Sequence, residues 1–212
     1  GKYNIETGET NENSQSNSDT SADYSRKGMK VGVDITIENG EYTIDSEDDG
    51  IHSNNSITVN AGTVNIASKD DGVHADTELT IENILGNNGR MMPGGGQGGF
   101  DESDGSELVI NGGIVHVNAG GDGIDSNGTI TINGGEIYVD GPTSGGDGAL
   151  DYADTCEING GILVAAGSIG MAIAPTSGST QYSVNAAFSK TYNGGTKVTV
   201  KDSSGNEVLT YT

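Results

Sequence analysis

Pairs of aspartates followed by glycine recur in this chain at a fixed distance. Ser46–His52 reads SerGluAspAspGlyIleHis, and Ser68–His74 reads SerLysAspAspGlyValHis. Asp71 follows Asp49 by 22 residues, and Asp49 follows Lys27 by the same distance. Carboxylate oxygens are the ligands that hard cations such as Ca²⁺ prefer. A single Asp-Asp pair at the surface indicates no particular function, whereas a stacked column of such pairs would form a cation site.

The acidic motif continues beyond these two copies. AspGlyIleAsp begins at Asp122, and AspGlyAlaLeuAsp begins at Asp147. Carboxylates on neighbouring rungs of stacked β-structure lie about 5 Å apart, so they repel one another unless a positive charge lies between them. We therefore expect bound Ca²⁺ at these turns, with the following metal ligands: Asp48, Asp49, Asp70, Asp71, Asp122, Asp125, Asp147 and Asp151.

Other interpretations of the same residues stay open. The acids can instead form a solvated, charged edge. At the first rung, where LysGlyMetLys replaces the acidic motif, Lys27 and Lys30 can pair with the carboxylates directly. His52 and His74 are expected to be outward-facing hydrogen-bonding residues rather than metal ligands. A zinc site built from Cys and His lacks its ligands.

The elements that position these turns must be short strands. Apolar residues alternate in groups, which is strand periodicity, and AsnGlyGly turns recur at Asn111, Asn133 and Asn159. A rung of about 22 residues with three such strands leaves no room for helices, and stacking the rungs buries a continuous core. The pattern predicts an all-β fold, a right-handed single-stranded parallel β-helix with three strands per rung.

Three apolar sets share this register. The first comprises Ile35 and Ile37, Ile57 and Val59, Leu79 and Ile81, Leu108 and Ile110, Ile130 and Ile132, and Cys156 and Ile158. The second comprises Tyr42 and Ile44, Val64 and Ile66, Val115 and Val117, Ile137 and Val139, and Leu163 and Ala165. The third is a single column of Met29, Ile51, Val73, Ile124 and Met171.

Residues 1–212 are expected to form one β-helix domain. Residues 9–25 and 86–105 are predicted to be loop insertions, because they are polar or rich in Gly, Met and Pro. Residues 196–212 carry a hairpin signal, and we expect this hairpin to cap the open end of the stack. The first five residues resemble the strand at 40–44, so the chain is predicted to be a fragment of a longer helix.

Composition narrows the classes of partner. The chain has 212 residues and a formal net charge of −22, which opposes direct binding to nucleic acid or to anionic membrane surfaces. No apolar run is long enough to insert into a membrane as a helix. Cys156 is the single cysteine and falls in an apolar column, so it is expected to be a buried core residue rather than a nucleophile.

The motifs AspAspGlyIleHisSerAsn, AspGlyIleAspSerAsnGly, GlyAspGlyAlaLeuAspTyr and AlaAlaGlySerIleGlyMetAla occur in this order. Together they resemble the carbohydrate-binding β-helix domain family of clostridial and related bacterial cell-surface proteins. The resemblance covers nearly all the chain. It implies bound calcium, a fold similar to pectate lyases of polysaccharide lyase family 9, and binding to polygalacturonate and cellulose. It also implies an extracellular place on the bacterial surface.

Three functions compete. The first is non-catalytic, calcium-dependent binding of acidic plant polysaccharide, in which Ca²⁺ bridges protein and uronate carboxylates. The second is a lyase that eliminates across a uronate, for which Lys30 is the only base in the motif column. The third is a structural or adhesive surface protein. The shortage of bases around the acids favours binding over catalysis. His116 and Tyr138 should face solvent, either as a stacking surface for sugar or as exposed filler.

Overall fold

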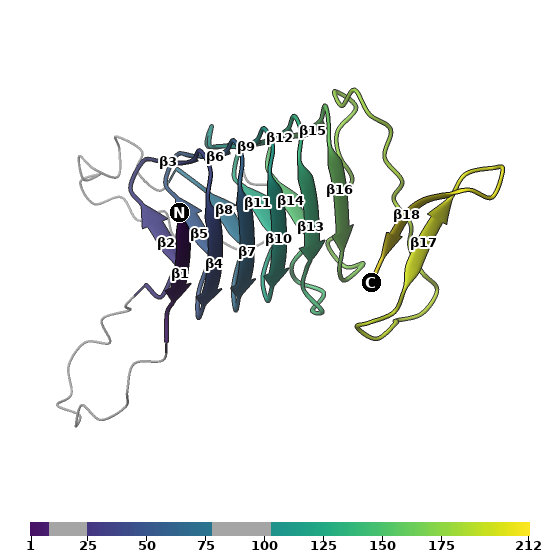
Figure 1. The fold of residues 1–212 in the computed structure, drawn as a ribbon, viewed down its shortest axis with the longest axis horizontal. Coiled ribbons are helices and arrows are strands. Elements are labelled where there is room, and N and C mark those ends of the chain that lie inside the picture. Colours follow the sequence, from purple (N-terminus) through teal and green to yellow (C-terminus); the bar gives the residue numbers. More distant parts are fainter. Residues whose placement is uncertain (9–24, 78–102) are drawn as a thin grey trace, which may run out of the picture.

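The strands form a stack of rungs, and each rung contributes one strand to each of three parallel sheets (Figure 1). The computed structural model describes residues 1–8, 25–77 and 103–212. These residues form strands and no helix. The described part of the chain therefore contains no helix that could span a membrane. The prediction of an all-β parallel β-helix with three strands per rung is confirmed.

The three sheets have the following members. Sheet A contains β1 (Lys2–Glu6), β4 (Glu41–Ser46), β7 (Thr63–Ser68), β10 (Ile114–Ala119), β13 (Glu136–Asp140) and β16 (Ile162–Ala166). Sheet B contains β2 (Met29–Val31), β5 (Ile51–Ser53), β8 (Val73–Ala75), β11 (Ile124–Ser126) and β14 (Leu150–Tyr152). Sheet C contains β3 (Asp34–Ile37), β6 (Ser56–Val59), β9 (Glu107–Ile110), β12 (Thr129–Ile132) and β15 (Thr155–Ile158).

The core is an aliphatic column inside the stack. Alternate residues of each strand point inward, and parallel pairing places like positions on top of one another. In sheet C, Ile57 lies in register with Leu108, and Ile130 with Cys156. These four side chains are at most 1% exposed. The prediction that Cys156 is a buried core residue is confirmed, and burial raises the pKa of its thiol to about 12.

The turns between sheets C and A repeat as precisely as the strands. Gly113 and Gly135 adopt φ of 90° and 94°, a region that glycine enters without steric cost. Before these glycines, the side chains of Asn60, Asn111 and Asn133 form a ladder. Each Nδ2 of the later residue donates to Oδ1 of the earlier one at 2.8 Å. The predicted AsnGlyGly turns are therefore joined from rung to rung.

One predicted column member is wrong, and two others are untested. Strand β6 pairs directly with β9, and the first apolar set had included Leu79 and Ile81 at this level. These two residues lie outside the described part of the chain, as do most of the predicted insertions at 9–25 and 86–105. In the third column, Leu150 follows Ile124. Met171, which was predicted there, is 46% exposed and belongs to no strand.

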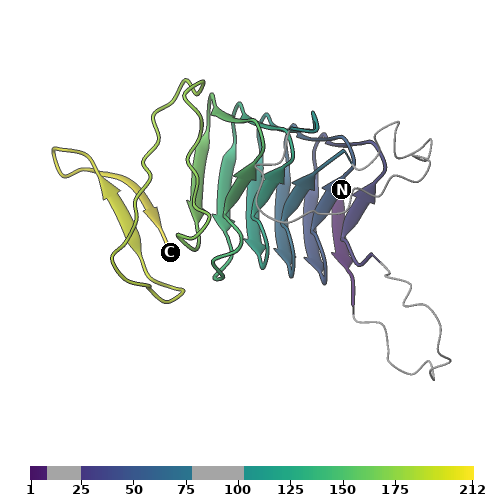
Figure 2. The same cartoon turned by 180° about the vertical axis from the view of Figure 1, so that it is seen from behind.

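A hairpin follows the last rung, as predicted. Strands β17 (Val198–Lys201) and β18 (Glu207–Tyr211) pair antiparallel and lie beyond β16 at the end of the stack (Figures 1 and 2). Tyr211 contacts the outside of sheet A, because its hydroxyl donates to Asp140 at 2.7 Å and its ring stacks on Tyr138. The hairpin is thereby tied to the β-helix by one side chain of β18.

Candidate metal centre at the acidic turns

The acidic motifs lie at the corner where the chain passes from sheet A to sheet B. The backbone there repeats closely: Gly28 N–H donates to the carbonyl of Asp49, and Gly50 N–H to that of Asp71, at 2.9 and 2.8 Å. A Cβ on Gly50 would lie 2.3 Å from a methyl of Ile66, so only glycine fits at this position. The AspGly sequence thus stacks the aspartates of successive rungs above one another.

The first acidic turn is balanced by a lysine. The Lys27 ammonium lies 3.1 Å from Oδ1 of Asp48 and also contacts Oδ2 of Asp49. Burial alone would lower the pKa of Lys27, but the two carboxylates raise it above its usual value. The direct pairing considered from the sequence is therefore present for Lys27. The carboxylates of Asp48, Asp49 and Asp70 lie within 4.8 Å of one another, so Lys27 takes the place that a cation would have among them.

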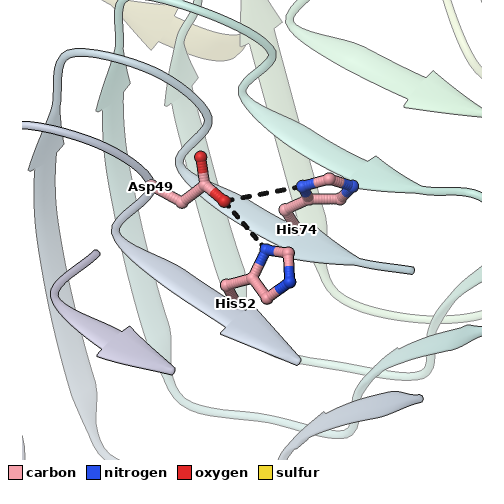
Figure 3. A group of neighbouring side chains, drawn as sticks. All are labelled: Asp49, His52 and His74. Atoms are coloured by element: carbon pink, nitrogen blue, oxygen red, sulfur yellow. Dashed lines mark hydrogen bonds and ion pairs between the residues drawn. The ribbon is translucent and has the colours of Figure 1, made fainter. Parts of the chain in front are cut away.

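Two histidines complete this first group (Figure 3). Oδ2 of Asp49 lies 2.9 Å from Nδ1 of His52 and 3.5 Å from Nδ1 of His74. Burial would raise the pKa of Asp49, but these contacts and Lys27 hold it well below its usual value. His52 is only 3% exposed, so it lies covered on the outer face of sheet B and is not open to solvent. The expectation that both histidines form polar contacts to neighbouring residues is confirmed.

The next acidic turns carry an excess of carboxylates. Burial raises the pKa of Asp71 to about 7, that of Asp122 to about 6 and that of Asp125 to about 8. Repulsion from neighbouring aspartates acts in the same direction, and His74 opposes it for all three. Although burial opposes its charged form, contacts with Asp49 and the other carboxylates raise the pKa of His74 to about 9. One imidazolium cannot balance this many anions.

Asp147 and Asp151 extend the excess, but only Asp151 keeps the register of the earlier turns. Asp151 lies in register with Asp125, and Gly123 N–H donates to the carbonyl of Gly148 rather than that of Asp147. It is therefore Asp147, not Asp151, that is displaced by one residue. Both carboxylates still raise the pKa of Asp122, so both lie within electrostatic reach of it.

Oxygen atoms of two of these carboxylates lie close beside Gly121. A Cβ on Gly121 would lie 2.6 Å from Oδ1 of Asp71 and 2.7 Å from Oδ1 of Asp70. Oδ1 of Asp71 also accepts the backbone N–H of Asp122 at 2.7 Å. Oxygen atoms converge here and no nitrogen ligand is needed, which fits the donor set of Ca²⁺. The residues of the second, third and fourth acidic turns therefore fit calcium better than the Lys27-balanced first turn.

Sequence reasoning missed the depth of this site. Asp76 was not singled out, yet it is 8% exposed, and its Oδ1 lies 3.4 Å from Nε2 of His52. The signal was its position, since it follows His74 by two residues. The outer face of sheet B is buried here, as the residues of β5 and β11 show. Without that information, the position of Asp76 does not indicate that it contacts the histidines.

The outer face of sheet A carries a different feature. His116 stacks on Tyr138 with ring centroids 5.0 Å apart, and Tyr138 stacks on Tyr211 at 5.9 Å. The expected exposure of His116 is confirmed, while Tyr138 is partly covered. Because each ring covers the flat face of the next, Tyr138 offers its edge rather than its face to a sugar.

Residues 1–83 match the family model described as "Carbohydrate-binding domain-containing protein". No curated protein and no solved structure matches the chain significantly. The matched segment includes the first two acidic turns and both histidines of Figure 3. Over these residues, the chain is similar to carbohydrate-binding domain-containing proteins.

Proposed function

We propose that this β-helix is a non-catalytic module that binds acidic polysaccharide through Ca²⁺ held at the acidic turns. The observation that carries the proposal is the match of residues 1–83 to a carbohydrate-binding family model. The structure adds the chemical reason for calcium, because Asp71, Asp122 and Asp125 form a partly buried anionic group with His74 as the base that opposes their repulsion.

The calcium ligands are drawn from the aspartates of the later turns. We assign them to Asp70, Asp71, Asp122, Asp125, Asp147 and Asp151. Asp48 and Asp49 were also predicted as ligands, but both already pair with Lys27, so we leave them out of the calcium site. Asp70 is exposed, so a cation beside it can complete its coordination with oxygen atoms from outside the protein.

Calcium also reconciles sugar binding with the charge of the protein. A chain with a formal net charge of −22 repels a polyuronate at ionic strengths where the Debye length is about 10 Å. A cation shared between the turn carboxylates and a uronate carboxylate reverses that interaction locally. Polygalacturonate is therefore the proposed ligand, with cellulose as a neutral comparison and the bacterial cell surface as the proposed location.

The alternative lyase function depends on Lys30. This residue is exposed on β2 and lies in register with His52 of the next rung. Its amine is therefore the base that the motif column offers beside the acidic turns. In elimination, Ca²⁺ would acidify the proton α to the uronate carboxylate, and a neutral amine would remove it. The same experiment that tests binding also tests this alternative.

The experiment measures retention of the protein on insoluble polygalacturonate in calcium and in chelator. We expect retention in calcium, its loss in chelator, and no growth of the ultraviolet absorbance that unsaturated uronate produces. Steady growth of that absorbance, abolished by Lys30→Ala, would establish the lyase instead. Equal absence of retention in both buffers would favour a structural role, and retention that chelator leaves unchanged would remove calcium from the mechanism.

A further inference from the structure

The two stacked histidines have an unusual set of neighbours. His52 and His74 are in register on β5 and β8, and their rings meet edge to face with centroids 4.9 Å apart. Both Nδ1 atoms turn toward the same carboxylate oxygen, Oδ2 of Asp49, as Figure 3 shows. Nδ1 of His74 also lies 3.4 Å from Oδ2 of Asp71.

The far side of each ring also meets oxygen atoms. Nε2 of His52 lies 3.0 Å from Oδ1 of Asn54 and 3.4 Å from Oδ1 of Asp76. Nε2 of His74 lies 3.1 Å from Oδ2 of Asp125. A neutral imidazole carries a single N–H, so its other nitrogen presents a lone pair. With oxygen atoms on both sides of each ring, that lone pair faces an oxygen unless the ring takes a second proton or a metal ion lies between them.

Some contacts of this network have poor geometry. Nε2 of His74 and Oδ1 of Asp76 are buried, and although each has a polar neighbour, neither makes a well-directed hydrogen bond among the described residues. Asp76 as a whole is 8% exposed and points at the two rings. Buried polar atoms without partners are costly, and a bound cation that reorients the rings and carboxylates is one way to satisfy them.

The distances fit a transition metal. Ligands about 2.1 Å from one metal ion at tetrahedral or octahedral angles lie about 3.0–3.4 Å from one another. The Asp49 oxygen lies 2.9 and 3.5 Å from the two Nδ1 atoms, and one donor atom each from Asp49, His52 and His74 falls within 4.8 Å of the others. The oxygen atoms behind each Nε2 resemble the outer contacts that orient metal-bound histidines.

We propose that Asp49, His52 and His74 bind a divalent transition metal of the Zn²⁺ class. This site is distinct from the calcium site in chemistry, because imidazole nitrogen suits borderline metals and hard Ca²⁺ takes oxygen. The metal would join the rungs of β5 and β8 across the sheet.

The test is calorimetric titration of the full chain with Zn²⁺ after chelator treatment, in buffer containing a large excess of Ca²⁺. We expect saturable binding of one Zn²⁺ that the Ca²⁺ does not displace. His52→Gln and His74→Gln should each weaken it by at least about tenfold, whereas His116→Gln should leave it unchanged. His116 is the remaining histidine of the chain and lies exposed on sheet A, so it is the matched control.

Two readouts guard against a variant that simply fails to fold. The far-ultraviolet spectrum of each variant is compared with that of the unchanged chain. Independently, Co²⁺ added to the unchanged protein should give visible absorption of a low-coordinate nitrogen and oxygen site, and Zn²⁺ should abolish it. Absence of Zn²⁺ binding, displacement by Ca²⁺, or equal loss in His116→Gln would each overturn the proposal. The experiment uses no sugar, so its failure leaves the proposed function standing.

Discussion

At the residue scale, the protein differs from turn to turn in how it neutralises its carboxylates. Lys27 contacts Asp48 and Asp49 in the first turn, so we assign no Ca²⁺ to that turn. Among the described residues, His74 is the base that lowers the pKa of Asp71, Asp122 and Asp125 alike. The same motif therefore gives a salt-bridged turn at one end of the column and the proposed calcium site further along.

Asp122→Asn should stabilise the protein in chelator but weaken its stabilisation by Ca²⁺. At pH 8 in chelator the carboxylate, whose pKa is raised to about 6, is charged among like charges, so its removal should raise the melting temperature. In calcium the same change removes a ligand and should reduce the stabilisation by Ca²⁺. Differential scanning calorimetry in both buffers checks this, with Asp45→Asn on the exposed face of β4 as the control. A fall of the melting temperature in chelator would contradict the account.

Gly121→Ala should weaken calcium binding. The added methyl would lie 2.6–2.7 Å from oxygen atoms of Asp70 and Asp71, so both carboxylates must move away from the proposed ion. We expect a loss of about tenfold or more in Ca²⁺ affinity by titration calorimetry. Gly146→Ala is the matched control, because a Cβ there meets nothing within 4 Å. Equal affinity in the two variants would place the ion elsewhere.

At the element scale, short strands hold the turns in register through their buried side chains. Ile130 of β12 is fully buried between Leu108 and Cys156. Ile130→Ala should lower the free energy of unfolding by about 2–5 kcal/mol, because it leaves a cavity in a closely packed column. Thr131→Ala, on the opposite face of the strand, should cost about 0.5 kcal/mol or less. Denaturant unfolding of the two variants measures the difference, and equal costs would argue against an inward Ile130.

The sequence was sufficient for the elements and for most of the register. Alternating apolar residues and the 22-residue spacing predict the strands, since each fixes which side chains face inward. They failed at Leu150, because an extra residue separates Asp147 from Asp151. Aligning the first aspartates would place Ala149 in register with Ile124, whereas the structure pairs Leu150 with Ile124.

The site could be predicted in kind but not in detail. The aspartate spacing predicts the column of carboxylates. It does not show that Lys27 reaches two of them, that His52 is buried, or that Asp76 turns toward the histidines. Those facts depend on side-chain directions and on the burial of the outer face of sheet B, which a period of 22 residues does not specify.

At the scale of the whole molecule, stability should depend on pH and calcium together. The carboxyl groups of Asp71, Asp122 and Asp125 have pKa values raised to about 7, 6 and 8, above their unfolded value near 3.8. The stability they contribute without metal is therefore present below about pH 4 and is lost as pH rises through 6 to 8. His74, raised to about 9, acts with the same sign, from 6.5 upward.

Calcium should reverse this trend, because it binds the ionised carboxylates. We expect the melting temperature in chelator to fall between pH 5 and pH 8, and the increase caused by Ca²⁺ to grow over the same interval. Thermal unfolding followed by circular dichroism at each pH, with and without Ca²⁺, measures both. A calcium effect that is equal at pH 5 and pH 8 would mean that the ion does not bind these groups.

The most direct test of the central claim is the affinity for a short galacturonate oligomer at a series of fixed free Ca²⁺ concentrations. If Ca²⁺ at the acidic turns bridges protein and uronate, linkage requires that each ligand strengthen the binding of the other. The account predicts that the oligomer's Kd falls as Ca²⁺ rises and then levels off, with the midpoint shifted to higher Ca²⁺ by Asp122→Asn. A Kd that stays constant across the calcium series would contradict it.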